Sequence, residues 1–209
     1  MLRYAVFAAT ALAALPALAH HPLGGAPMTT LQDGLLSGVG HPILGFDHLF
    51  FILALGIAAQ AAGRALSGPL AFLGAMAVGV IFVANGFQPP LVEPLIAVSL
   101  LLLGLAMIRG RMLSTAPLLA LFALAGLVHG AAFGDAIAGQ EGGAGAPVLI
   151  GYLVGLIGVG WALAVASGAV AVRVGGGAPR IAGAAVAGVG MFLILEAVEG
   201  AAFAAAGLG

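Results

Sequence analysis

Two histidines and one aspartate stand within eight residues of a very apolar sequence, in the stretch HPILGFDH. They are His41, Asp47 and His48. Imidazole nitrogens and carboxylate oxygens together suit a divalent ion such as nickel, cobalt or zinc. A carboxylate beside a ligating histidine can also orient its ring through the second nitrogen. The alternatives without metal are a histidine that caps a helix, an aspartate that favours a helix N-terminus, and a hydrogen-bonded core histidine.

The composition of the chain is that of an integral membrane protein. Its 209 residues are 63% hydrophobic and 6% charged, whereas soluble proteins have about 25% charged residues. The net charge of −1 gives no reason to expect a nucleic-acid partner. Cysteine is absent, so a metal site must use nitrogen and oxygen ligands.

The first nineteen residues have the pattern of a cleaved signal peptide. Arg3 supplies a positive charge, residues 4–15 are apolar, and an A-x-A cleavage signal ends at Ala19. Cleavage would place His20 and His21 at the new N-terminus, where the free amine and two imidazoles could collect a metal ion. An uncleaved first span and a tail without metal are the alternatives.

Residues 20–209 are expected to form one membrane domain. The six apolar segments are Pro42–Ala62, Pro69–Phe87, Leu91–Ile108, Ala116–Ala138, Ala146–Val172 and Ile181–Leu208. Each is long enough to cross about 30 Å of hydrocarbon as a helix. The sequence therefore predicts an all-α, six-helix transmembrane bundle, with a short interfacial helix over Leu31–Gly38. Small residues spaced by four, such as Gly151 and Gly155, or Gly79 with its neighbours, predict close helix contacts.

The arginines give the orientation of this bundle. Alternate connections carry Arg64, Arg109, Arg111, Arg173 and Arg180, whereas the other connections carry Glu93 and Glu141 and no arginine. Arginine is enriched in cytoplasmic loops. We therefore expect a bacterial inner-membrane protein whose mature N- and C-termini are both periplasmic.

The ionisable residues inside the expected helices converge at one depth. Counting 1.5 Å per residue places Asp47 and His48 roughly 7–9 Å, His129 roughly 12 Å and Glu196 roughly 8 Å below the periplasmic surface, with Glu199 one turn above Glu196. Such residues are costly in a membrane and are functional candidates. The sequence thus predicts one polar layer in the outer half of the bilayer.

Helical spacing adds detail to this layer. His41 and His48 are seven residues apart and Glu196 and Glu199 three apart, so each pair is expected on one helical face. The alternative for the glutamates is a hydrogen bond with Asn85 or with backbone.

Three motifs resemble those of the HupE/UreJ family of bacterial nickel or cobalt permeases. They are HHPLGG directly after the signal peptide, HPILGFDH, and VHGAAFGD in the fourth span. The resemblance covers the whole chain and implies metal recognition by His41, Asp47, His48 and His129. In the family pattern a second histidine follows the histidine-glycine pair, and Phe133 stands in its place here.

The resemblance implies a secondary permease rather than an enzyme, one that takes up nickel or cobalt and supplies the maturation of nickel enzymes. The ion is cargo, and no permanently bound cofactor is expected. No P-loop is present, so uptake would depend on the membrane potential, at about 2.3 kcal/mol per charge per 100 mV, or on trapping of the ion in the cytosol by the maturation system of a nickel enzyme. Two alternatives stay open: an intramembrane hydrolase with zinc on three histidines, and a metal-sensing accessory protein without transport. The expected partners are the divalent ion and the lipid bilayer, and a homo-oligomer is left open.

Overall fold

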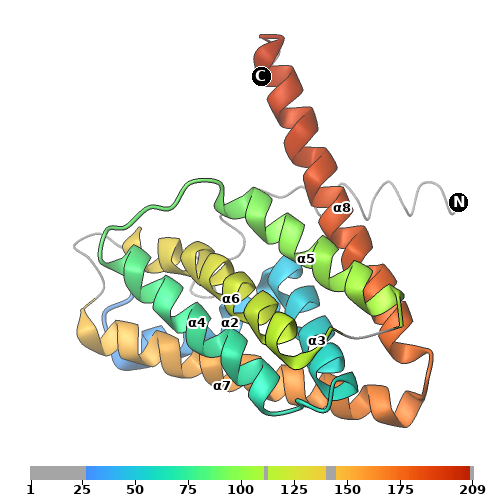
Figure 1. Ribbon diagram of the computed structural model, residues 1–209. Coiled ribbons are helices and arrows are strands. Elements are labelled where there is room, and N and C mark those ends of the chain that lie inside the picture. Colours follow the sequence, from blue (N-terminus) through green and yellow to red (C-terminus); the bar gives the residue numbers. More distant parts are fainter. Residues whose placement is uncertain (1–26, 111–112, 140–144, 208–209) are drawn as a thin grey trace, which may run out of the picture.

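The computed structural model describes residues 27–110, 113–139 and 145–207, and this part of the chain is all-helical, without strands. The predicted signal peptide, His20, His21 and Glu141 lie outside the described residues. The helices are α2 (Leu31–Leu44), α3 (Phe46–Ala61), α4 (Ser67–Ala84), α5 (Val92–Ile108), α6 (Thr115–Ala138), α7 (Ala146–Val174) and α8 (Ala178–Ala205) (Figure 1).

The last five helices follow the predicted apolar segments closely. Within the described residues, α4, α6, α7 and α8 are long and apolar enough to cross a membrane, and the bent pair α2–α3 would add a fifth span. Helix α5 is apolar but has only 17 residues. The structure therefore supports four or five spans, and the six-span arrangement stays a prediction.

The first predicted segment is not one continuous helix. The chain bends by 80° between α2 and α3, and Gly45 at the break has an extended backbone. Pro42, where the first predicted segment begins, lies inside α2 near its end. Proline cannot donate a backbone hydrogen bond, so α2 is weakened there. The expectation that His41 and His48 share one helical face is therefore wrong, because they belong to different helices.

The helices pack mainly as three pairs: α4 with α6, α2 with α7, and α5 with α8. Glycine permits this close contact. A Cβ atom added to Gly79 would lie 2.3 Å from the carbonyl oxygen of Leu127, and one added to Gly151 would lie 2.1 Å from that of Leu31. The predicted role of these glycines in helix contact is confirmed.

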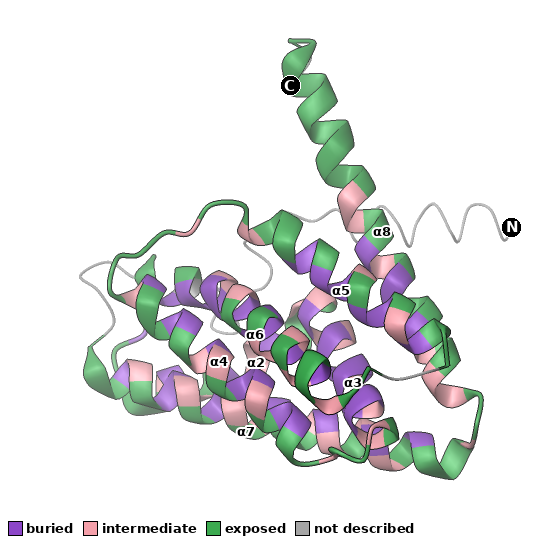
Figure 2. Ribbon diagram, in the orientation of Figure 1, coloured by how far each residue is buried: buried purple, intermediate pink, exposed green. Residues whose placement is uncertain are grey.

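Helix α8 has two distinct halves. Its buried residues, Gly183, Val186, Ala187 and Gly190, all lie in the first half, which packs on α5 and α3. The second half extends beyond the bundle to the C-terminus and is almost entirely exposed (Figure 2). Only the first half of α8 therefore contributes to the core.

Candidate metal site

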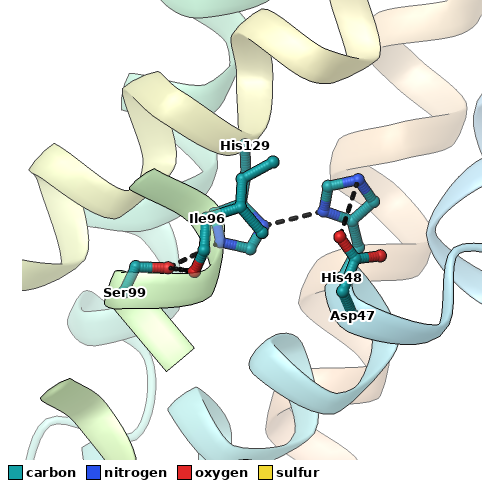
Figure 3. Close-up of polar contacts among 5 residues, drawn as sticks. All are labelled: Asp47, His48, Ile96, Ser99 and His129. Atoms are coloured by element: carbon teal, nitrogen blue, oxygen red, sulfur yellow. Dashed lines mark hydrogen bonds and ion pairs between the residues drawn. The ribbon is translucent and has the colours of Figure 1, made fainter. Parts of the chain in front are cut away.

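Two buried histidines from different helices meet inside the bundle. His48 lies in the first turn of α3 and His129 in the middle of α6, and their Nδ1 atoms are 2.8 Å apart (Figure 3). His48 is 7% exposed and His129 is fully buried. The prediction that these two residues lie close together is confirmed.

Aromatic rings enclose the histidine pair. The ring centroid of His129 lies 4.6 Å from that of Phe51 and 5.6 Å from that of Phe72. The ring of His48 lies 4.2 Å from that of Phe133. This apolar packing fixes both imidazole planes and strengthens the electrostatic interactions of any charge beside them.

Asp47 places a carboxylate at the edge of the pair. Its Oδ2 atom is 3.9 Å from Nε2 of His48, and 28% of its side chain is exposed. Asp47 occupies the first turn of α3, where the helix dipole favours negative charge. Two bonds of about 2.1 Å to one ion need donor atoms about 3.0–3.4 Å apart, so this nitrogen and oxygen would have to approach by about 0.5–0.9 Å to contact the same ion.

The break before α3 lies against the ring of His48. A Cβ atom on Gly45 would lie 2.8 Å from Cδ2 of His48. Any larger residue would therefore push against the imidazole. Gly45 is needed here for space rather than for its backbone angles, since its φ of −76° is open to other residues.

His41 belongs to a neighbouring group. Its Nδ1 atom is 3.1 Å from the hydroxyl oxygen of Tyr152, and this hydroxyl donates a hydrogen bond to the carbonyl oxygen of Phe133. The Phe133 ring contacts both histidines of the HPILGFDH motif, with centroids 5.2 Å from His41 and 4.2 Å from His48. The residue that departs from the family pattern thus lies between the two histidines.

Ser99 and Tyr152 are polar contacts of these histidines that the sequence reasoning missed. Ser99 on α5 is buried, and its Oγ atom lies 2.9 Å from Nε2 of His129. A buried hydroxyl in an apolar helix needs a polar partner. This requirement was the signal that could have connected Ser99 with a histidine.

The structure does not bring the glutamates to the histidine pair. Glu196 and Glu199 are exposed on the half of α8 that extends from the bundle. Asn85 caps the end of α4, and its side chain donates a hydrogen bond to the carbonyl oxygen of Ile81 in the same helix. The depth estimate gave the level of each residue along its helix axis but not the direction in which the helix runs relative to the others.

In the described part of the chain, no three histidine, aspartate or glutamate side chains form a group able to hold a metal ion. The described polar layer consists of Asp47, His48 and His129. Both ring nitrogens of His129 lie within hydrogen-bond distance of protein atoms. Asp47 and His48 are therefore the pair best placed to contact an ion directly.

Comparison with known proteins gives the family. The model of the family described as HupE / UreJ protein matches residues 8–193. The chain belongs to the HupE/UreJ family. Together with the apolar helices, this membership indicates an integral membrane protein of a transporter or accessory family.

The family has a curated relative among the proteins compared. Protein HupE of Rhizobium leguminosarum bv. viciae is 37% identical over 94 residues, which are 44% of this chain and 47% of that protein. The match thus spans about half the length of the relative. No solved structure matches the chain.

Proposed function

We propose that this HupE/UreJ protein is a secondary permease that takes up nickel or cobalt across the bacterial inner membrane. The observation that supports this most directly is the partly exposed carboxylate of Asp47 beside the buried, oriented ring of His48. Carboxylate and imidazole are suitable ligands for these ions. Family membership and the name of the curated relative, HupE, are consistent with a role in hydrogenase or urease metal supply.

The residues of the layer would act in different ways. Asp47 attracts the ion through its charge, and His48 offers a ring nitrogen next to that charge. His129 supports His48 from the interior side rather than contacting the ion itself. Two further pairs of residues stay candidate ligands outside this layer. Glu196 and Glu199 are exposed on α8. His20 and His21 lie outside the described residues.

Contacts between connections support the proposed orientation. The guanidinium of Arg64, which precedes α4, donates to the hydroxyl of Thr115 at the start of α6. Gly110, which follows α5, lies so close to Arg180 of α8 that a Cβ atom there would be 2.6 Å from its Nη2. The connection between α5 and α6 thus contacts both of the other arginine-bearing connections. Asp47 lies at the opposite end of α3 from Arg64. If the arginines face the cytoplasm, the Asp47 carboxylate faces the periplasm.

The experiment that tests the proposal is uptake of radiolabelled nickel into proteoliposomes with an imposed, inside-negative potential. We expect saturable uptake by the wild-type protein and its loss in Asp47→Asn and in His48→Ala. Asp47→Asn keeps the shape of the side chain and removes its charge, and asparagine serves a helix N-terminus well. Asp135→Asn makes the same change at an exposed carboxylate near the end of α6 and should transport normally.

Each alternative predicts another result. A hydrolase would cleave a peptide or lipid substrate in a parallel assay and give no flux, and a sensor would bind nickel without flux. Normal uptake by well-inserted Asp47→Asn and His48→Ala proteins would show that this layer does not handle the ion. Competition by cobalt in the same vesicles would give the metal preference.

A further inference from the structure

Two adjoining cavities lie near the end of α3 that is opposite Asp47. The larger cavity has a volume of about 400 Å³ and lies between the end of α3, the end of α5 and the start of α8. The smaller cavity, of about 260 Å³, lies between α3, α7 and the connection from α7 to α8. Ala61, Gly176 and Pro179 line both cavities, so the two spaces are neighbours.

Among the described residues, Arg180 contributes the one charged side chain to the lining of the larger cavity. A Cβ atom added to Gly110 would lie 2.6 Å from Nη2 and 3.0 Å from Nε of Arg180, so the guanidinium packs against the backbone of Gly110. The φ angle of Gly110 is +67°, a conformation that residues with a side chain rarely adopt. The turn after α5 therefore both makes room for the guanidinium and fixes its position.

The Arg180 guanidinium is also unpaired within the part of the chain that the structure describes. No carboxylate there forms an ion pair with it, and no oxygen accepts a hydrogen bond from it. Arg64, by contrast, donates to the hydroxyl of Thr115. A guanidinium is always charged, and its planar set of N–H donors matches the oxygens of a phosphate. The larger cavity thus suits an anion, and a phosphate in particular.

The smaller cavity has a different chemistry. Apart from the amide of Gln60, the described side chains in its lining are apolar, and they include Ile57, Ala61, Ala171, Val172 and Pro179. An apolar lining favours hydrocarbon over water. The two neighbouring spaces therefore suit the two parts of an amphipathic anion.

We propose that the two cavities together form a binding site for an anionic phospholipid, whose phosphate contacts Arg180 and whose acyl chain occupies the smaller cavity. A free phosphate would use only the larger cavity, and a neutral hydrocarbon only the smaller one. A phospholipid uses both because its charge and its hydrocarbon belong to one molecule. Basic pockets between membrane helices bind lipid head groups. In the orientation proposed above, this lipid comes from the cytoplasmic leaflet, where anionic lipids give a negative surface potential.

The test measures lipid binding to the purified full-length protein by native mass spectrometry. Phosphatidylglycerol is compared with phosphatidylcholine, which has the same acyl chains but no net charge. We expect the wild-type protein to bind phosphatidylglycerol about tenfold more tightly, the factor that corresponds to one hydrogen bond with a charged group. Arg180→Gln should abolish this preference. Arg173→Gln is the matched control, because Arg173 is an exposed arginine in the last turn of α7 that lines neither cavity, and it should keep the preference.

A second variant tests the smaller cavity. Ala61 is exposed and lines both cavities, so Ala61→Phe fills space there and removes no charge. It should weaken the binding of phosphatidylglycerol, while circular dichroism shows unchanged helical content. Glycerol phosphate has the charge of the lipid but no acyl chains, and at equal concentration it should not displace the bound phosphatidylglycerol.

Each result supports or overturns the lipid site. Equal affinity of the wild-type protein for both lipids overturns it, even if Arg180→Gln fails to fold. Equal losses in Arg180→Gln and Arg173→Gln overturn it as well, because they would show a general attraction of anions to this end of the bundle. Displacement by glycerol phosphate would indicate a site for free phosphate instead, and unchanged binding by Ala61→Phe would show that the smaller cavity holds no acyl chain. None of these measurements involves nickel, so their outcome is independent of the proposed permease.

Discussion

The contact between α4 and α6 gives a prediction whose size follows from the structure. Gly130 follows His129 on α6, and a Cβ atom added to it would lie 2.1 Å from the carbonyl oxygen of Met76 on α4. An ordinary contact begins at 3.4 Å, so Gly130→Ala must separate these atoms by about 1.3 Å. Forcing extra atoms into a packed interface costs about 1–3 kcal/mol.

This displacement also reaches the histidine pair. The contact between His48 and His129 can lengthen from 2.8 Å only to about 3.5 Å before the hydrogen bond is lost. Gly130→Ala should therefore lower both stability and nickel uptake. Gly74→Ala is the matched control, because it lies on α4 with no atom within 4 Å of the added Cβ and replaces a poor helix former by the best one.

The assay is thermal unfolding of the purified proteins, followed by the fluorescence of Trp161, the single tryptophan of the chain. A loss of about 2 kcal/mol corresponds to a fall in melting temperature of about 4–8 °C. Gly74→Ala should leave the melting temperature unchanged or raise it by a few degrees, about 2–4 °C. Equal melting temperatures for Gly130→Ala and Gly74→Ala would refute the close approach of α4 and α6.

Three further predictions concern the site and the orientation. Tyr152→Phe removes the hydroxyl that joins His41 to the carbonyl oxygen of Phe133 and should cost about 1 kcal/mol in thermal unfolding; an unchanged melting temperature would argue against these bonds. Phe133→His places an imidazole against both His41 and His48 and should tighten nickel binding in calorimetry, and unaltered affinity would show that the two histidines do not act together. A reporter fused to the C-terminus should be active only in the periplasm, and cytoplasmic activity would reverse the orientation.

Much of the helical framework was predictable because apolar runs long enough to cross a bilayer form helices. The ends of α5, α6 and α7 lie within a few residues of the predicted segments. The meeting of His48 and His129 followed from counting 1.5 Å per residue along two helices. The count for His48 began at Pro42, which lies in α2, so it predicted the meeting of the two histidines but not the break that precedes His48.

The break in the first segment, the position of Glu196 and the contact of Ser99 were not predictable in the same way. Neither Pro42 nor Gly45 marks a break unambiguously, because both are nonpolar and Pro42 equally suits the first turn of a helix. The position of Glu196 depends on how far α8 stays in contact with α5, which its own sequence does not record. Ser99 gave a weak signal, since a single hydroxyl can also be satisfied by its own helix.

The break at Gly45 has a consequence for water. A helix end leaves backbone carbonyl and N–H groups without partners inside the helix, and hydrocarbon cannot satisfy them. Helix α2 ends and α3 begins on either side of this one residue, so both kinds of group occur next to Asp47. We expect water to reach this depth, and an arriving cation could then exchange its hydration shell stepwise for the oxygen of Asp47 and the nitrogen of His48. In the proposed permease, the interruption of the helix would thus lower the barrier to dehydration at the point where the ion first leaves bulk solvent.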